Sequence, residues 1–521
     1  MASSVKPVVV IVGGGSSGWS AAALLSASPS LDIKVIEPVQ NNPIGVGEST
    51  LPVINTFHEG TELKALKGRK WLDQVDGTAK FSIQFEDFYK LDGRKWVHPF
   101  FVTPGPDVEV VEKLQAGKAE SAANLRQADW VEKNLLLGKM QAEKFWEGPD
   151  ISALPTGFHF DAALYGAYLR DAVLTERPHV KLIKGAVTDV TRDESDKILT
   201  LGLNTGDQVS GDYFVDCTGF KSLLSTGGSI DYTDRLYCDT ALAAQLPYID
   251  KELQQRNTTH CKALSAGWVW NVPLQSRIGT GYVYSSRHMN QAEAEQEFRA
   301  YLEQRFGYPP SEVSLRRVDF TPRRKVEPWR DNVISIGLSG FFLEPLESTG
   351  IALTHLAIQR LRPLLEQTML PLHKRRAKFN QCVNARADEA MEFIDAHYAL
   401  SERQDSQFWR DARSGRLSEA QQGIFSGYVA ENVDFDDSTV RDAVGTFMFF
   451  PAGSWALLMY GYGFQPNSSA ALTSFVDARR NICASCPHKR TILNQGYCAE
   501  CNCIVALKTK LKSAACPIGK W

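Results

Sequence analysis

The chain has 521 residues, of which 43% are hydrophobic and 22% charged, so it can bury a large core and is not predicted to be disordered. Its 57 lysines and arginines nearly balance its 60 aspartates and glutamates, which leaves no global field for attracting nucleic acid or anionic lipid. The sequence has no apolar run of the roughly 18 residues that span a bilayer, and the N-terminus lacks a secretory signal pattern. We therefore expect a soluble, cytoplasmic protein with more than one folding unit and no contact with membrane or nucleic acid.

The first predicted element is a strand over residues 7–12, a continuous apolar run typical of a strand buried on both faces. A glycine-rich turn and a helix opening follow, and a second apolar run at 33–37 completes a β-α-β unit. Gly13, Gly15 and Gly18 have the spacing G-x-G-x-x-G, and Glu37 ends the second run. This combination predicts a dinucleotide site.

Each residue of this unit has a physical role in such a site. Gly13 permits the tight turn, Gly15 lets a pyrophosphate approach the backbone, and Gly18 allows the helix to pack closely on the sheet. The helix N-terminus faces the phosphates, and Glu37 can accept hydrogen bonds from a ribose diol. The pattern alone does not distinguish FAD from NAD. Because only one such unit is visible, we expect the reducing electrons to come from a separate partner.

Further strands are predicted at 213–219 and 332–337, each ending in glycine, and a helix from 348 to about 367. Ser348 or Thr349 is the expected N-cap of that helix. Residues 411–437 are largely polar, so we expect a loop or lid there. We predict an α/β fold with three units: residues 1–370, a mainly helical region at 371–480, and a small C-terminal module at 481–521.

Four further segments point to one family. They read I-G-V-G-E-S-T at 44–50, G-W-V-W-N-V-P at 267–273, G-Y-V-Y-S at 281–285 and F-L-E-P-L-E-S-T-G-I at 342–351. Together they resemble the flavin-dependent halogenases of the tryptophan halogenase family, whose hallmark G-W-x-W-x-I-P is present with Val272 in place of isoleucine. The resemblance runs from about residue 7 to at least 360, and more loosely to about 465.

This resemblance implies a Rossmann-like FAD-binding domain of the flavin monooxygenase and halogenase type, with a mixed α+β substrate region. It implies that reduced FAD, dioxygen and a halide ion form hypohalous acid, which a tunnel guides to an electron-rich aromatic substrate. There Lys80 captures or hydrogen-bonds the acid, Glu347 assists, and the ring is halogenated by electrophilic substitution. A separate flavin reductase would supply reduced FAD, and we expect a homo-oligomer. The sequence leaves the preferred halide and the substrate open.

The same match assigns further residues. Thr349 and Gly350 would line the halide site. The substrate and tunnel residues would be His98, Phe100, Trp268, Trp270, Ser348 and Trp455. The FAD contacts would be Gly13, Gly15, Ser16, Ser17, Gly18, Trp19, Glu37, Gly47, Glu48, Ser49, Val187, Leu338 and Ile351.

Without the resemblance, these residues have plainer interpretations. Lys80 begins an alternating stretch, 80–86, whose polar face would suit the solvated side of a strand. Glu347 precedes a predicted helix, where an acid complements the helix dipole. Trp268 and Trp270 lie two residues apart and so point the same way on a strand, as core aromatic residues do. The family resemblance implies instead that the two indoles separate the flavin from the substrate.

The C-terminal module has a composition of its own. Two C-x-x-C pairs, Cys483 with Cys486 and Cys498 with Cys501, suit tetrahedral zinc, with Cys503 and Cys516 as alternative ligands. An iron–sulfur cluster and disulfides are the competing interpretations. The ending, C-P-I-G-K-W, resembles Cys-rich modules of phage-encoded proteins.

Two alternatives to a halogenase remain at this point. One is a flavin monooxygenase on the same scaffold. The other is a flavin-binding docking or regulatory protein that works through its Cys-rich tail.

Overall fold

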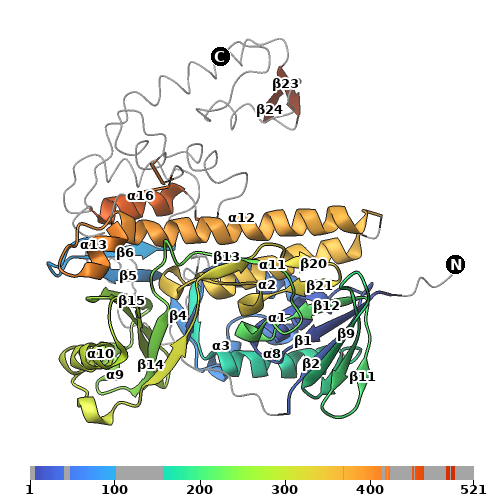
Figure 1. Cartoon of the computed structure of the whole chain (residues 1–521), viewed down its shortest axis with the longest axis horizontal. Helices are drawn as coiled ribbons and strands as arrows, with labels where there is room; N and C mark the ends of the chain where they lie inside the picture. The colour runs from blue at the N-terminus through green and yellow to red at the C-terminus, as the bar shows by residue number, and fades with distance from the viewer. Residues whose placement is uncertain are drawn as a thin grey trace.

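The computed structural model describes most of the chain N-terminal to residue 413 and short segments beyond it (Figure 1). The described residues are 6–39, 47–100, 156–367, 369–413, 417–418, 421–422, 449–450, 452–462, 489–492 and 495–498. Two large sheets lie side by side, and a long helix crosses above both of them (Figure 1).

The first large sheet has six strands in the order β20-β21-β12-β1-β2-β8. The pairings from β21 to β8 are parallel and β20 is an antiparallel edge, so this is the Rossmann-like sheet that the sequence predicts. The strands are β1 (Val8–Val12), β2 (Asp32–Glu37), β8 (Lys181–Lys184), β12 (Tyr213–Asp216), β20 (Trp329–Arg330) and β21 (Val333–Ser335).

Alternation along β1 shows why its sequence is apolar throughout. Val9 and Ile11 pack into the core shared with the helices, whereas Val10 and Val12 pack against a three-stranded sheet on the opposite face. Both faces of the strand are therefore buried. The helices are α1 (Ser16–Leu25), α2 (Val53–Thr61), α8 (Ala162–Glu176) and α11 (Thr349–Glu366), and the covering sheet is β9 (Val187–Arg192), β10 (Ile198–Leu203) and β11 (Gln208–Val209).

The second large sheet has seven strands in the order β18-β14-β17-β16-β15-β5-β6. One face packs on α10 (Gln291–Phe306), and the other packs on α12 (Leu372–Ala399), α13 (Gln407–Arg413) and α16 (Ala452–Gly461). The strands are β5 (Ser82–Glu86), β6 (Lys95–Pro99), β14 (Thr240–Pro247), β15 (Thr258–Ala263), β16 (Gly267–Pro273), β17 (Arg277–Tyr284) and β18 (Arg316–Asp319).

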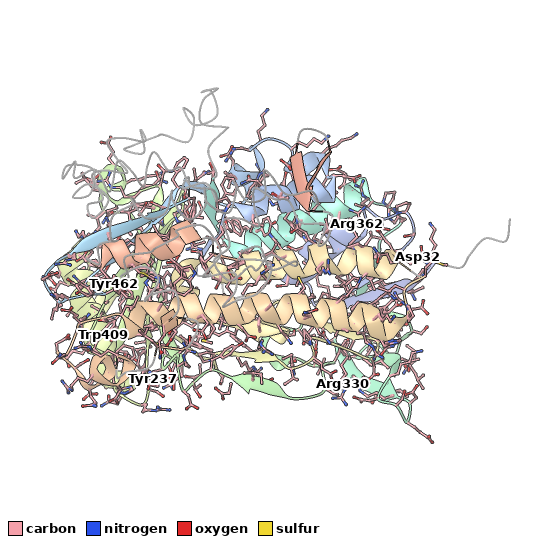
Figure 2. All side chains as sticks on the ribbon, turned by 90° about the horizontal axis from the view of Figure 1, so that it is seen from above. Asp32, Tyr237, Arg330, Arg362, Trp409 and Tyr462 are labelled. Carbon is pink, nitrogen blue, oxygen red and sulfur yellow. The ribbon has the colours of Figure 1, made fainter. Side chains whose placement is uncertain are left out.

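Helix α12 joins the two cores. Phe379 belongs to the core of the first sheet, whereas Phe393 and Ile394, near the other end of the helix, belong to the core of the second. Figure 2 shows the helix lengthwise, with Trp409 and Tyr462 near one end and Asp32 and Arg330 toward the other. The boundary predicted at residue 370 falls in the short connection between α11 and α12, which pack on each other.

One expectation about this region is wrong. Residues 411–413 belong to α13 rather than to a loop, because Phe408, Trp409 and Ala412 turn one helical face into the core of the second sheet. The remainder of the expected lid lies almost entirely outside the described residues.

Smaller elements complete the fold. A three-stranded sheet, β3 (Glu48–Ser49), β7 (Gly157–Phe160) and β4 (Thr78–Lys80), connects the two large sheets, and β13 (Ser229–Asp231), β19 (Arg323–Lys325) and β22 (Phe341–Phe342) form another. In the tail, β23 (Lys489–Ile492) and β24 (Gln495–Cys498) form a hairpin. The short helices are α3 (Trp71–Gln74), α9 (Lys251–Gln254), η1 (Lys64–Leu66), η2 (Gly219–Lys221), η3 (Pro310–Glu312), η4 (Gly337–Ser339) and η5 (Pro345–Glu347).

Candidate active site

The glycine loop lies between β1 and α1, and its shape suits a phosphate-bearing cofactor. Gly13 has φ +121°, and a Cβ there would lie 2.3 Å from the carbonyl oxygen of Cys217. A Cβ on Gly18 would lie 1.9 Å from the carbonyl oxygen of Gly13. At Gly15, by contrast, an added Cβ would meet no described atom beyond its chain neighbours within 4 Å, so a pyrophosphate can approach. With the free amides in the first turn of α1, including those of Ser16 and Ser17, this loop fits FAD.

The acid predicted to bind the ribose lies at the end of β2. Glu37 is buried, and its Oε2 pairs with Nζ of Lys184 at 2.7 Å. A carboxylate has further lone pairs, so Glu37 can accept from a ribose diol as well. Val187, Leu338 and Ile351 lie on β9, η4 and α11, and their contact with FAD stays a prediction, as does that of Trp19, which is fully buried in α1.

Three of the residues assigned to FAD, Gly47, Glu48 and Ser49, belong by the same resemblance to a strap between the flavin and halide sites, and Gly47 has φ +80°. Glu48 and Ser49 form β3 and pair with Phe160 and His159 of β7. Burial, reinforced by the charge of Asp161, raises the pKa of Glu48 to about 7. Strand β7 thus pairs with β3 on one side and, on the other, with β4, which carries Lys80.

Lys80 is fully buried at the end of β4. Its Nζ donates to Oγ of Ser348 at 2.6 Å and lies 4.8 Å from the centre of the Phe100 ring. Burial lowers the pKa of Lys80 from 10.5 to about 7, although the charges of Glu347 and Cys261 oppose the shift. The alternative interpretation, a solvated strand face, is therefore wrong, because every residue of β4 and β5 is buried.

Ser348 occupies the N-cap position of α11, but its side chain does not cap the helix. The residue is left-handed, with φ 59°, and its hydroxyl bonds Lys80 and Ser49 instead. Thr349 is fully buried, and its hydroxyl has no hydrogen-bond partner among the described residues. A Cβ on Gly350 would meet nothing within 4 Å in the described part of the chain apart from its own helix. An open space, an unused hydroxyl and free helix amides together suit a small anion.

Glu347 is held between two histidines. Its Oε2 lies 2.9 Å from Nδ1 of His98, and its Oε1 lies 2.9 Å from Nε2 of His397. Burial alone would raise its pKa, but the charge of His98 and hydrogen bonds from both imidazoles lower the pKa of Glu347 to about 2. The carboxylate is therefore ionised at neutral pH.

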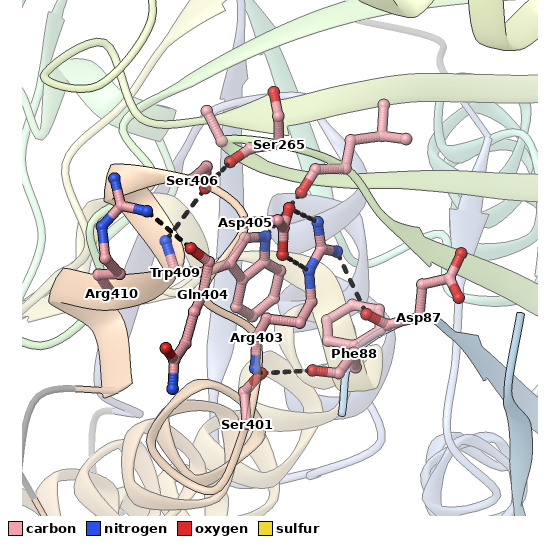
Figure 3. Close-up of polar contacts among 12 residues, drawn as sticks. Asp87, Phe88, Ser265, Ser401, Arg403, Gln404, Asp405, Ser406, Trp409 and Arg410 are labelled. Carbon is pink, nitrogen blue, oxygen red and sulfur yellow. Dashed lines mark hydrogen bonds and ion pairs between the residues drawn. The ribbon is translucent and has the colours of Figure 1, made fainter. Parts of the chain in front are cut away.

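His397, which sequence reasoning missed, comes from the last turn of α12. The segment after the helix is anchored where β5 ends (Figure 3): Ser401 donates to the Phe88 carbonyl at 2.7 Å, and Arg403 donates to the Asp87 carbonyl at 3.2 Å. Arg403 also pairs with Asp405 and lies 4.5 Å from the centre of the Trp409 ring. These contacts fix the end of α12 and so the imidazole on Glu347. No motif marks a lone histidine within a helix, so no sequence signal could have found it.

The two predicted tunnel tryptophans lie in the core of the second sheet. Their ring centres are 6.3 Å apart on β16. Trp268 is fully buried, and its Nε1 donates to Oε2 of Glu344 at 2.6 Å. Trp270 lies across Gly281, where a Cβ would come within 2.1 Å of the indole. Glycine at 281 therefore makes room for Trp270, which explains why both family segments occur together.

The predicted substrate side is partly described. Nε2 of His98 lies 2.9 Å from the hydroxyl of Ser454 on α16, a second contact that the sequence did not indicate. Trp455 is 2% exposed and packs edge-on against Phe393 of α12. Phe100 packs against the same core and touches Lys80. His98 thus contacts Glu347 and Phe100 contacts Lys80, whereas Trp455 packs on Phe393 in the same core.

Comparison with known proteins identifies the family. The family model for tryptophan halogenases matches residues 8–478. The chain belongs to the tryptophan halogenase family. It is 30% identical to 7-chloro-L-tryptophan 6-halogenase KtzR of Kutzneria sp. (strain 744), over 87% of this chain and 90% of that protein. It is 29% identical to tryptophan 7-halogenase RebH of Lentzea aerocolonigenes, over 79% and 80% of the two chains.

Solved structures agree with this assignment. A flavin-dependent halogenase from Xanthomonas campestris, Xcc4156, is 29% identical and superposes with a TM-score of 0.75, covering 90% of this chain and 91% of its own. Tryptophan 6-halogenase SttH from Streptomyces toxytricini is 27% identical, with a TM-score of 0.77 over 90% and 93% of the two chains. This tryptophan halogenase family member is therefore an FAD-dependent halogenase with the predicted α/β fold.

Two further features do not belong to the site described above. The family match ends at residue 478, before the Cys-rich tail, and of the predicted metal ligands only Cys498 falls within described residues. A cavity of about 560 Å³ lies beside α9 and the end of α10, and its lining includes neither Lys80 nor Glu347. In the described ranges, no helix is long and apolar enough to cross a membrane.

Proposed function

We propose that this halogenase attaches a halogen to an electron-rich aromatic small molecule by electrophilic substitution, with Lys80 delivering the halogen and Glu347 taking the ring proton. One observation carries the proposal: Lys80 and Glu347 are both fully buried, and Ser348, the residue after Glu347, accepts a hydrogen bond from Lys80. When bound in the glycine loop, reduced FAD supplies the electrons with which dioxygen and halide become hypohalous acid. A separate flavin reductase would deliver that reduced FAD.

The start of α11 is the proposed halide site. The first-turn amides and the unused hydroxyl of Thr349 supply donors, and Gly350 leaves the space open. Thr349 and Gly350 directly follow Glu347 and Ser348 in the chain. The proposed halide site therefore lies next to the hydrogen bond between Ser348 and Lys80.

Lys80 has the chemistry to carry a halogen. With a pKa of about 7, a large part of the population is a neutral amine near neutral pH. Hypohalous acid can exchange an N–H bond of that amine for an N–halogen bond. The hydroxyl group of the acid takes the released proton and leaves as water. The full burial of Lys80 and its contact with the Phe100 ring keep solvent from hydrolysing the product.

Glu347 has the complementary role. After the ring carbon gains the halogen, its proton passes to the ionised carboxylate, and the C–H electron pair restores aromaticity. His98 bridges Glu347 and Ser454 and so holds the carboxylate in place. The relatives KtzR and RebH are halogenases of 7-chlorotryptophan and tryptophan. We therefore propose indoles as the first substrate class to test.

The test is mass spectrometry of an aromatic panel incubated with the full chain, reduced FAD, air and chloride, bromide or iodide. We expect a halogenated product that disappears in Lys80→Ala and Glu347→Gln. An oxygenated product without halogen would instead indicate a flavin monooxygenase. Biological activity that survives both substitutions but needs the tail would indicate a docking protein.

A further inference from the structure

A continuous path of hydrogen bonds begins at Lys80 and passes through Ser348 toward the second sheet. Every member is a side chain until the last, which is a backbone carbonyl. In order, the heavy-atom distances are Lys80 to Ser348, 2.6 Å; Ser348 to Ser49, 3.0 Å; Ser49 to Thr259, 2.8 Å; Thr259 to Nε2 of His159, 2.8 Å; Nδ1 of His159 to Thr78, 3.1 Å; and Thr78 to the carbonyl of Pro273, 2.7 Å.

The topology explains why these residues meet. Strand β7 lies between β3 and β4, so His159 faces Ser49 on one side and Thr78 on the other. Thr259 comes from β15, which pairs in parallel with β5. Strand β5 begins two residues after Lys80. One fully buried histidine therefore links the flavin strap, the lysine strand and the second sheet.

The direction of every hydrogen bond follows from the far end. The Pro273 carbonyl can only accept, so Thr78 donates to it and must accept from His159. A neutral imidazole that carries its proton on Nδ1 has an accepting Nε2, so Thr259 donates to it. The hydroxyl protons of Ser49 and Ser348 must then also point away from Lys80. Ser348 is left as an acceptor.

We propose that His159 is a positioning residue for Lys80: held in the Nδ1–H form by Thr78, it keeps Ser348 accepting, so that the lone pair of the neutral amine stays free for the halogen. This inference rests on the proposed function of Lys80. When Lys80 is an ammonium, its own protons also impose this direction. Once the amine is neutral, only the Pro273 end does so.

The charges around the path are consistent with this role. Burial, aided by the charge of Lys80, lowers the pKa of His159 well below its usual value, so the ring stays neutral with one donor and one acceptor. Among the described residues, the ionisable groups whose charge acts on Lys80 are Glu347 and Cys261. Burial and Glu347 raise the pKa of the Cys261 thiol, so Glu347 is the charged neighbour of Lys80 at neutral pH.

Neutron diffraction from deuterium-exchanged crystals of the full chain at pH 8 tests the direction without any catalysis. We expect deuterium on Nδ1 of His159, none on Nε2, and the Ser348 deuteron pointing toward Ser49. Deuterium on Nε2, or a Ser348 deuteron aimed at Lys80, overturns the inference. A wild-type protein that shows the expected deuterons but halogenates nothing would instead refute the proposed function.

A single-turnover pH profile with photoreduced FAD tests the consequence. Thr78→Val leaves Nδ1–H of His159 without its acceptor, so the path can reverse and Ser348 can donate to the amine. We expect the midpoint of the rise in rate to move down by roughly 0.5 to 1 pH unit, with a several-fold slower rate. Thr259→Val, which interrupts the path, should have the same sign. An unmoved midpoint in both folded variants overturns the inference.

The matched control is Thr61→Val. Thr61 is also fully buried and also donates to a backbone carbonyl, that of His58 at 2.7 Å, but it lies outside the path. Thr61 also accepts from the backbone N–H of Leu63 at 3.3 Å, so its replacement removes two hydrogen bonds, as Thr78→Val does, and should leave the midpoint in place. Thermal unfolding of the three variants shows whether any rate change reflects stability alone.

Discussion

Replacing the buried lysine should make the protein more stable while abolishing halogenation. A lysine whose pKa falls from 10.5 to about 7 on folding opposes folding at every pH below 10.5, because the unfolded chain binds a proton that the folded protein binds less tightly. Methionine matches the length of the lysine stem and needs no proton, so Lys80→Met removes this penalty.

The size and the pH dependence of the gain follow from the same shift. A shift of this size corresponds to roughly 5 kcal/mol at or below pH 6 and about 2 kcal/mol at pH 9. The sign is fixed: the unfolded state binds more protons between the two pKa values, so wild-type stability rises there with pH and the advantage of Lys80→Met shrinks. The difference between pH 6 and pH 9, about 3 kcal/mol, is the quantity to measure.

Urea unfolding followed by circular dichroism at pH 6 and pH 9 measures it. Lys181→Met is the control, because Lys181 is exposed on β8 and its replacement should change stability little at either pH. If Lys80→Met is no more stable than wild type at pH 6, or if its advantage does not shrink by pH 9, then Lys80 is not the desolvated amine that the halogen-transfer step requires.

Three further outcomes are expected. Gly350→Ala should fold normally, because a Cβ there meets no described atom outside its own helix, but it should raise the KM for halide several-fold in steady-state assays by narrowing the anion space. Arg403→Ala should lower the free energy of unfolding by about 2 kcal/mol and lower kcat, because the end of α12 that holds His397 against Glu347 loses its anchor; unchanged kcat would mean that the anchor is structural only. The purified full chain should contain about one zinc per chain by elemental analysis, and Cys498→Ser should reduce that content; iron with sulfide would point to a cluster instead.

The elements that the sequence predicted well have patterns set by local burial. The strand at 7–12 is apolar throughout because both faces of β1 are covered, and the glycine turn after it can be identified from spacing alone. The helix from 348 to about 367 was confirmed as α11. Strands predicted to 219 and 337 end earlier, at Asp216 and Ser335, because the residues after them turn into η2 and η4.

The site was predicted by resemblance, and pattern reasoning alone would have misplaced it. The alternation at 80–86 indicates a solvated face, yet Lys80 and Gln84 are both buried, and Lys80 contacts the hydroxyl of Ser348 and the ring of Phe100. Ser348 was expected to cap α11, but its hydroxyl instead accepts a hydrogen bond from Lys80, which lies 268 positions earlier in the chain. His159 lies 79 residues after Lys80 in the chain, and His397 lies 50 residues after Glu347. No periodic sequence pattern marks either histidine. Contacts of this range exist only once the two sheets are in place.

Lys80 and Glu347 share one buried site but are set to different tasks by the number of partners each has. Glu347 has an imidazole donor on each oxygen, which overcomes desolvation and holds its pKa near 2. Lys80 has one hydroxyl acceptor, so desolvation dominates and its pKa falls to about 7. Near neutral pH the carboxylate is therefore charged, while the amine can exchange between its protonated and neutral forms. In the proposed mechanism, the same enclosure that favours the neutral amine would also exclude water from a halogen bound to it, so reactivity and protection would have a common cause in the burial of this strand end.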